Sequence, residues 1–321
     1  MIAPLARFLD WSAIQFVALM KPDNVTDPRL EEAIQFLKSP AFAPAESPPA
    51  EVELDGSSRF HFPTPQPCDI AENNIVHGRL YRCPGHWQQR PAIILLHGWG
   101  DSANYRVRFP LIARRCNRAG INAATLVAPY HFQRRPRQRG TFDGGDCVLW
   151  AKRAAQAIAE IRAMTRWLLN EGCPAVALWG VSMGAVHAGM TACLDARPAG
   201  VVMASPAVRC NPWVEQRAVR RRICARLPIV RELCEKMNQT AMDLTTTRPA
   251  IPTERILLVE GMHDLICPRE DVEDLWQSWG QPNIWRLPHG HVSICCGGVP
   301  GLTGKVLRWL TPRMHSRQPS C

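Results

Sequence analysis

The sequence predicts an α/β protein with a mostly parallel central sheet flanked by helices. From about residue 93 onward, short apolar runs alternate with longer segments of helical periodicity, which is typical of parallel strands covered on both faces. Before them lie two segments that alternate apolar and polar residues, as half-exposed antiparallel strands do. Of the 321 residues, 46 % are apolar and 21 % are charged, so the chain can bury one large core.

The first fifty residues are expected to form a helical extension and a linker. The first helix has a rough apolar face made of Leu5, Phe8, Leu9, Ser12, Ile14 and Phe16. Asp27-Pro28 opens a second helix over residues 30–37, and residues 39–49, rich in Pro, Ala and Ser, are typical of a linker. Residues 51–312 are predicted to be the main domain, and residues 313–321 a C-terminal tail.

Eight strands follow in order. The two half-exposed strands cover residues 58–62 and 74–81. The six buried strands cover residues 93–96, 122–127, 175–179, 201–204, 256–259 and 283–287. A long helix over about residues 147–170 has apolar residues at spacings of three and four, and Gly172 lies where a helix stop is expected. Further helices are expected over residues 185–194 and about 299–310.

An arginine-rich segment over about residues 208–252 is longer than a strand-to-helix connection needs. Residues 217–226 and 230–237 have helical patterns, so a small helical cap over the sheet is expected. The net charge is +10, and arginines also cluster at residues 134–139. Such clusters can attract nucleic acid, acidic lipids or anionic substrates. No zinc-finger, RNA-recognition or homeodomain signature accompanies them, so a solvated basic surface is favoured over specific nucleic-acid binding.

The thirteen cysteines are scattered and contain no CxxC pair, which gives no support to a zinc-ribbon or thioredoxin-like protein. Mostly buried, reduced thiols in a cytoplasmic protein are expected. No signal peptide is evident and no run of about eighteen apolar residues occurs, so a membrane-spanning helix is not expected. The oligomeric state stays open.

The sharpest motif is Gly180-Val181-Ser182-Met183-Gly184, between a buried strand and an apolar helix. This is the context of a nucleophile elbow, a tight turn that holds a serine in a strained conformation and lifts its hydroxyl above the sheet. Glycines at both ends remove side chains that would collide with the strand and the helix. Ser182 is therefore the candidate nucleophile.

A second motif, His97-Gly98-Trp99-Gly100, directly follows the first buried strand. In hydrolases with a nucleophile elbow, this position supplies one backbone N–H of the oxyanion hole, and the residue after the nucleophile supplies the other. Trp99 and Met183 are the expected donors, with Gly100 as the alternative to Trp99. His97 is interpreted as a structural histidine that braces the loop.

Two later loops supply the remaining candidates. Asp264 follows the fifth buried strand and can hold an imidazole in the correct tautomer, whereas the competing acid Glu260 lies closer to the strand. His289 and His291 compete as the base after the last strand. The resulting chain order, serine then aspartate then histidine, is specific to one hydrolase fold, and open α/β sheets bind ligands at the carboxyl ends of their strands.

These four segments resemble the α/β-hydrolase superfamily over roughly residues 60–310. Within it, the run Pro129-Tyr130-His131-Phe132-Gln133-Arg134-Arg135-Pro136, the GVSMGA elbow and the PHGHVS loop resemble the group containing abhydrolase domain-containing protein 18. The resemblance implies the α/β-hydrolase fold and an intact triad, and its G-H-x-S loop favours His291 over His289. One departure is Ala185, where many relatives have a second glycine; alanine is small enough to keep the close packing.

The expected function is hydrolysis of a carboxylic ester, or less favoured an amide or thioester, by a Ser182-His291-Asp264 triad acting on a small-molecule acyl substrate. No metal or organic cofactor is required. Three alternatives stay open: acyl transfer on the same triad, a non-catalytic binding protein on a hydrolase scaffold, and nucleic-acid binding through the arginine clusters.

Overall fold

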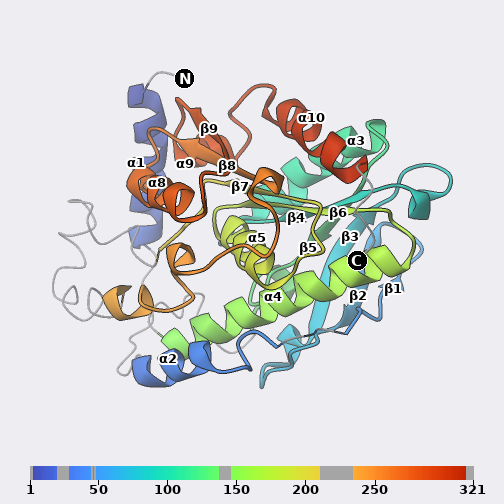
Figure 1. The fold of residues 1–321 in the computed structure, drawn as a ribbon, viewed down its shortest axis with the longest axis horizontal. Helices are drawn as coiled ribbons and strands as arrows, with labels where there is room; N and C mark the ends of the chain where they lie inside the picture. Colours follow the sequence, from blue (N-terminus) through green and yellow to red (C-terminus); the bar gives the residue numbers. More distant parts are fainter. Residues whose placement is uncertain are drawn as a thin grey trace.

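The central feature of the fold is one sheet of nine strands in the order β1-β2-β3-β5-β4-β6-β7-β8-β9 (Figure 1). The computed structural model describes residues 3–19, 29–44, 46, 48–136, 146–209 and 234–315. The strands are β1 (Glu53–Leu54), β2 (Arg59–Pro63), β3 (Ile75–Tyr81), β4 (Ala92–Leu96), β5 (Asn122–Leu126), β6 (Val176–Val181), β7 (Gly200–Ala204), β8 (Ile256–Gly261) and β9 (Asn283–Leu287).

The sheet is antiparallel at one edge and parallel elsewhere. β1, β2 and β3 pair antiparallel, and β3 pairs antiparallel with β5, whereas β4 to β9 all run parallel to one another. The eight predicted strands are present with ends within two residues of the prediction, and only the short β1 was not expected. The predicted mostly parallel sheet is therefore confirmed.

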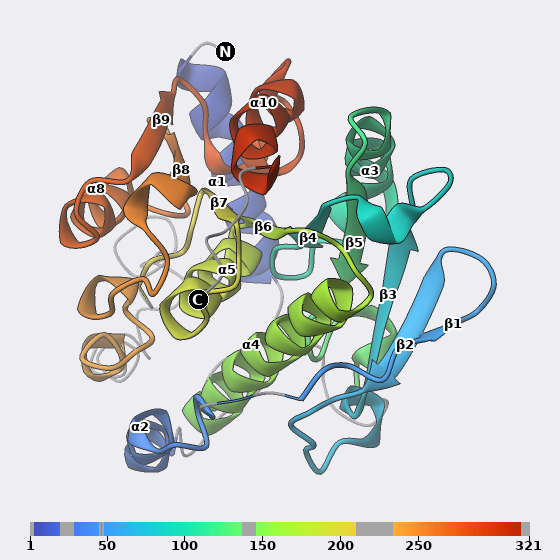
Figure 2. The ribbon, with the colours of Figure 1, turned by 45° about the vertical axis from the view of Figure 1, so that its right-hand side comes forward.

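Helices cover both faces of the sheet (Figure 2). On one face lie α4 (Cys147–Asn170), α5 (Met183–Leu194) and α8 (Arg269–Ser278), and α2 (Leu30–Lys38) packs against α4. On the other lie α3 (Phe109–Arg118) and α10 (Leu302–His315). Successive side chains of β4 divide between the two layers: Ile94 joins the core on the α4 side and Ile93 and Leu95 the core on the α3 side. The continuous apolar runs of the parallel strands follow from this two-sided burial.

Among the described residues, three helices were not predicted, namely α3, α8 and the five-residue α9 (His291–Cys295), and one was predicted too short. α3 begins with Phe109 and Pro110 and carries three arginines, so its apolar stripe is short although it is buried. α8 begins with acidic residues and buries only Val272 and Leu275, so its apolar pattern in the sequence is also weak. α10 continues to His315 rather than ending at residue 310, because the proline at 312 does not stop it.

The first helix, α1 (Ala3–Leu19), buries a face that shares only Ile14 with the described part of the predicted face. Leu5 and Phe8 are 52 % and 60 % exposed, whereas Ala6, Asp10 and Ile14 are buried. The buried residues are four apart, so they form one stripe along the helix. The prediction for Leu5 and Phe8 was wrong because it followed hydrophobicity, while the buried stripe contains a carboxylate.

Several predicted segments lie wholly or partly outside the described residues. They are the predicted helix at 217–226, the first part of the predicted helix at 230–237, the arginines beyond residue 136 in the 134–139 cluster, and the last residues of the predicted tail. The side chain of Phe16 is also outside them. The short helix η6 (Leu244–Thr246) belongs to the predicted cap segment, and its Leu244 is buried in the core beneath α5.

Within the described ranges, no helix combines the length and the apolar character needed to cross a bilayer.

Candidate active site

Three side chains from three loops meet at the carboxyl edge of the parallel sheet. Ser182 follows β6, Asp264 follows β8, and His291 follows β9 and begins the short helix α9 (His291–Cys295). The Ser182 Oγ lies 3.1 Å from His291 Nε2, and His291 Nδ1 lies 2.9 Å from Asp264 Oδ2. The structure thus joins the three predicted site residues in one hydrogen-bonded chain at the edge where open α/β sheets bind ligands.

The backbone at Ser182 has the strained geometry of a tight strand-to-helix turn. Its φ of 52° and ψ of −120° lie outside the regions that non-glycine residues ordinarily adopt. A Cβ on Gly180 would sit 2.1 Å from the carbonyl oxygen of Gly184, and a Cβ on Gly184 would sit 2.3 Å from that of Leu96. The glycines therefore permit the close approach that lifts the Ser182 hydroxyl above the sheet.

The loop after β8 fixes the Asp264 carboxylate in one orientation. Oδ1 accepts hydrogen bonds from the backbone N–H groups of Ile266 and Cys267, at 2.8 and 2.7 Å. Oδ2 is left to accept from His291 Nδ1. Because Nδ1–H faces the carboxylate, Nε2 is the acceptor that faces the serine hydroxyl, which is the tautomer a general base requires.

The pKa of the His291 imidazole reflects two opposing influences. Burial lowers this pKa, while the neighbouring Cys295, Asp264 and Cys267 raise it, and the balance leaves it well above the ordinary 6.5. Burial also raises the pKa of the Cys267 thiol to about 12, so that thiol is neutral when the imidazole titrates. The Asp264 carboxylate is the charged partner that favours the imidazolium.

The competing candidates have other partners. The backbone N–H of His289 donates to the Leu287 carbonyl, and its carbonyl accepts the backbone N–H of His263. The side-chain hydrogen bonds to Ser182 and Asp264 are made by His291. Glu260 is buried within β8 and forms ion pairs with Arg269 and Arg286, at 2.9 and 3.6 Å. Among the described residues, the ring that bonds both the Ser182 hydroxyl and the Asp264 carboxylate is therefore that of His291.

The loop after β4 lies directly against the serine. A Cβ on Gly98 would be only 3.3 Å from the Cβ of Ser182, so the backbone at this point passes close beside the hydroxyl. Met183 is the first residue of α5, and a first-turn N–H has no carbonyl partner within its own helix. Trp99 and Met183 thus belong to the two segments that flank Ser182.

His97 braces this loop, as expected. Its Nδ1 lies 2.7 Å from the Gly98 carbonyl oxygen, and its Nε2 accepts the backbone N–H of Ala128 at 3.0 Å. Burial lowers the pKa of His97 to about 4, so the ring stays neutral near pH 7. Both ring nitrogens are engaged with backbone, and the side chain ties the ends of β4 and β5 together.

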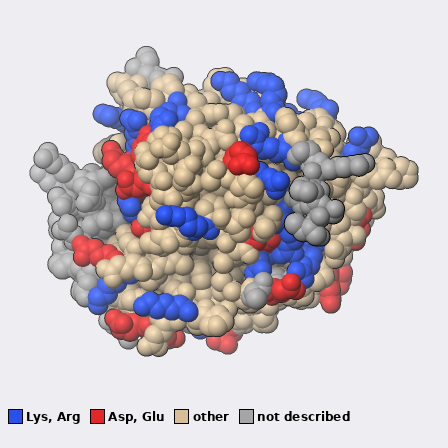
Figure 3. Space-filling view, viewed as in Figure 1, with Lys and Arg blue, Asp and Glu red and all other residues tan. Residues whose placement is uncertain are grey.

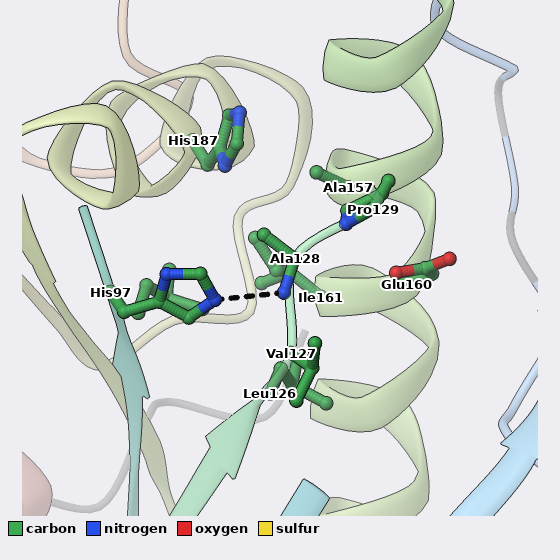
Figure 4. Close-up of a pocket in the computed structure, with 10 residues that line it drawn as sticks. His97, Leu126, Val127, Ala128, Pro129, Ala157, Glu160, Ile161 and His187 are labelled. Carbon is green, nitrogen blue, oxygen red and sulfur yellow. Dashed lines mark hydrogen bonds between the residues drawn. The ribbon is translucent and has the colours of Figure 1, made fainter. Parts of the chain in front are cut away.

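A small pocket beside His97 lies between the ends of β4 and β5 and the helices α4 and α5 (Figure 4). His187 of α5 and Glu160 of α4 contribute to its walls, which are otherwise mostly apolar. None of the three hydrogen-bonded site side chains lines it. It is therefore a space within the scaffold beside the site.

Among the described residues, Asp264, Cys267 and His291 form the one group whose ligand atoms lie close enough to hold a metal ion, within 4.8 Å of one another. The aspartate and histidine atoms of this group already share a hydrogen bond. That arrangement suits transfer of a proton between Ser182 and His291, with Asp264 holding the imidazole in place.

Sequence reasoning did not find Cys267 or Asp10 near the site. Asp10 reaches it from α1, and its carboxylate accepts the backbone N–H groups of Leu265, His291 and Val292. No spacing signal could have linked residues 281 positions apart.

Comparisons with known proteins identify the family of this chain. A family model described as alpha/beta hydrolase domain containing 18 matches residues 61–224, slightly more than half of the chain. The chain belongs to this family. The matched span includes the loop after β4, the elbow and Ser182, and ends before Asp264 and His291.

Two curated relatives of this alpha/beta hydrolase domain containing 18 member come from Mycobacterium tuberculosis. Uncharacterized protein MT2702 of strain CDC 1551 / Oshkosh is 27 % identical over 233 residues, covering 69 % of this chain and 54 % of the relative. Uncharacterized protein Rv2627c of strain H37Rv matches with the same values. The chain spans about half the length of the curated relatives it matches.

Solved structures share the fold of this family member. Acetyl xylan esterase 1 from Thermoanaerobacterium sp. JW/SL YS485 superposes with a TM-score of 0.62 at 15 % identity, covering 94 % of this chain and 98 % of the esterase. Acetyl xylan esterase from Paenibacillus sp. R4 gives 0.57 at 15 % identity, covering 92 % and 98 %. The similarity confirms the predicted α/β-hydrolase fold.

One of the clustered arginines has a structural partner. Arg134, the first arginine of the 134–139 cluster, is fully buried and forms a bidentate salt bridge with Glu160, with N–O distances of 2.6 and 2.8 Å. On the face in Figure 3, basic side chains occur in several places with acidic side chains between them. The buried arginine belongs to the scaffold.

Proposed function

We propose that the protein is a serine hydrolase that cleaves a carboxylic ester through an acyl-enzyme on Ser182. The observation that supports this most is the chain of hydrogen bonds from Ser182 Oγ through His291 to Asp264, with distances of 3.1 and 2.9 Å. Both distances are within hydrogen-bond reach for a nucleophile and its base. Membership in an α/β-hydrolase family and the strained serine conformation support the same proposal.

In the first half of the reaction, Ser182 Oγ attacks the acyl carbon while His291 Nε2 accepts the hydroxyl proton. The resulting imidazolium is stabilised by the Asp264 carboxylate, which itself stays ionised. His291 then gives the proton to the departing alkoxide oxygen, so the alcohol leaves and the acyl group stays on Ser182. In the second half, His291 takes a proton from water while the hydroxide attacks the acyl carbon; His291 then returns that proton to Ser182 Oγ as the C–Oγ bond breaks and the carboxylic acid leaves.

The developing oxyanion would be bound by the backbone N–H groups of Met183 and Trp99. Met183 contributes the free first-turn position of α5, where the helix dipole also favours negative charge. Trp99 follows Gly98, the residue packed against Ser182. Each such donor contributes roughly 3 kcal/mol to the transition state in enzymes of this kind. The mechanism assigns no step to a metal or organic cofactor.

Labelling with a fluorophosphonate tests the proposal. The wild-type protein should form an adduct on Ser182, and Ser182→Ala should form none. Ser205→Ala is a matched control, because Ser205 also follows a parallel strand and has a positive φ, of 44°, but lies after β7. Folded wild-type protein that forms no adduct on Ser182 would refute the proposal.

An ester panel of increasing acyl length, with amide and thioester analogues, would then define the bond cleaved. Adding an alcohol or thiol acceptor to the same assay separates hydrolysis from acyl transfer, since transfer gives a new ester or thioester product at the expense of free acid. A non-catalytic binding protein would release no product from any member of the panel.

A further inference from the structure

A carboxylate from the N-terminal helix reaches into the backbone of the two loops that hold Asp264 and His291. Asp10 of α1 is completely buried. Its Oδ2 accepts the backbone N–H of Leu265 at 3.0 Å and that of His291 at 2.8 Å, and its Oδ1 accepts the N–H of Val292 at 2.8 Å. The Asp10 side chain thus binds the backbone of Leu265, which follows the candidate acid Asp264, and the backbone of the candidate base His291.

These contacts use donors that the loops cannot satisfy on their own. His291 and Val292 are the first two residues of α9, and N–H groups in a first helical turn have no partner within the helix. The residue before them is Gly290, which has no side chain to cap the helix. Asp10 supplies the missing acceptors from a different helix, 281 residues away in sequence.

Gly290 is shaped to this carboxylate. A Cβ at position 290 would lie 2.7 Å from Asp10 Oδ2 and 2.9 Å from Asp10 Cγ. Its φ of −98° is open to any residue, so backbone conformation does not demand glycine here. The close approach of Asp10 is the reason a side chain cannot be accommodated.

Burying an ionised carboxylate beside Asp264 is costly, which argues that the contact serves more than packing. Burial raises the pKa of Asp10, the backbone hydrogen bonds oppose this, and the charge of Asp264 raises it further. An apolar residue would fill the same stripe of α1, between Ala6 and Ile14, without that cost. An apolar residue, however, has no acceptor for these backbone N–H groups, so it could not hold the Asp264 and His291 loops in place relative to each other.

We propose that Asp10 is a positioning residue of the active site, which clamps the acid loop to the base loop so that His291 stays in line between Asp264 and Ser182. The inference rests on the proposed function, because the geometry it protects is that of the triad. The clamp places α1 inside the machinery of the site, and Figure 1 shows this helix alongside α9. Asp10 touches no reacting atom and acts through the two loops.

The main test is Asp10→Asn, which keeps the size of the side chain. An amide has one acceptor oxygen, so it cannot serve the Leu265 and His291 donors at one atom and the Val292 donor at the other. The NH₂ group would face an N–H, and the start of α9 would move. Displacements of about 1 Å can cost roughly 100-fold in rate, so kcat for the best ester should fall about 10- to 100-fold with a smaller change in KM.

A second variant disturbs the same contact by changing Gly290 instead of Asp10. Gly290→Ala leaves Asp10 intact but places a methyl group against its carboxylate, and it should lower kcat by a similar factor. The double variant Asp10→Ala/Gly290→Ala relieves this clash, so the two effects should be non-additive. Ser12→Ala is the control on α1: its hydroxyl bonds only to the Phe8 carbonyl of the same helix, and kcat should be unchanged.

Two readouts separate positioning from a purely structural role. The groups facing the His291 ring are Asp264, Cys267 and Cys295, with the Asp10 carboxylate behind its backbone. Removing the Asp10 charge should therefore shift the acidic limb of kcat/KM to lower pH. In proton NMR, the low-field resonance of His291 Nδ1–H should move or broaden in Asp10→Asn.

The outcomes decide between the possibilities. A lowered Tm with unchanged kcat and an unchanged Nδ1–H resonance would overturn the inference and leave Asp10 a structural residue. Wild-type protein that fails to label at Ser182 would refute the proposed function separately. In that case the Nδ1–H resonance still tests the clamp: a shift in Asp10→Asn supports it, and an unchanged resonance refutes it.

Discussion

Asp264→Asn should inactivate the protein in a way that the structure specifies. The carboxylate has one oxygen committed to the backbone N–H groups of Ile266 and Cys267 and the other to His291 Nδ1. An asparagine at this position has one oxygen, and two backbone donors hold it where Oδ1 now lies. Its NH₂ group is then forced to face His291.

The consequence is a change of tautomer at the base. Nδ1 must now accept a hydrogen bond from the amide, so the ring proton moves to Nε2. A protonated Nε2 cannot take the proton of Ser182 Oγ, 3.1 Å away. The expected loss is about 10⁴-fold in kcat. At about 1.36 kcal/mol for each factor of ten, this corresponds to roughly 5 kcal/mol of transition-state stabilisation.

The assay is the rate of fluorophosphonate labelling and of ester hydrolysis in folded Asp264→Asn. Asp55→Asn is the matched control, since Asp55 also accepts backbone N–H groups, from Ser57 and Arg59, in the turn between β1 and β2. The control should keep wild-type rates. A fall of less than tenfold in Asp264→Asn, with Tm preserved, would show that Asp264 does not set the tautomer of His291.

Three further outcomes are expected. Because the pKa of His291 lies above 6.5, its imidazole stays protonated to higher pH, so kcat/KM should rise with a midpoint above 6.5; a midpoint at or below that value contradicts the assigned charge environment. Glu160→Gln should lower the free energy of unfolding in urea by about 3–5 kcal/mol, since it leaves a buried arginine uncompensated, whereas the exposed Glu46→Gln should change it little. Gly184→Ala should displace the elbow, because the new methyl would meet the Leu96 carbonyl oxygen at 2.3 Å, and labelling at Ser182 should fall at least about tenfold; an unchanged rate would mean that the elbow can shift without cost.

The sequence predicted the parts of the molecule that local chemistry dictates. Strands such as β4 were found because buried parallel strands leave an uninterrupted apolar run. The elbow was found because its glycines are required by contacts within a few residues of Ser182 and with the neighbouring strand. The loops of Asp264 and His291 were found from strand ends and chain order alone.

Other features depend on contacts that no local pattern records. The choice of His291 over His289 came from a resemblance, and the structure supports it through the bonds to Asp264 and Ser182. The buried face of α1 was missed because its central residue, Asp10, is polar and finds its partners near the other end of the chain. A pattern based on hydrophobicity assigns such a residue to solvent.

The Asp10 clamp also bears on how the protein is made. Its partner Val292 lies 282 residues further along the chain. At synthesis rates of about 5–20 residues per second, roughly 15–60 s pass between the emergence of the two ends. During that interval the buried stripe of α1, made of Ala6, Asp10 and Ile14, has no completed docking surface. The nascent chain therefore holds an incomplete site until β9 and the loop of His291 have been made, and a product truncated before that point lacks the base.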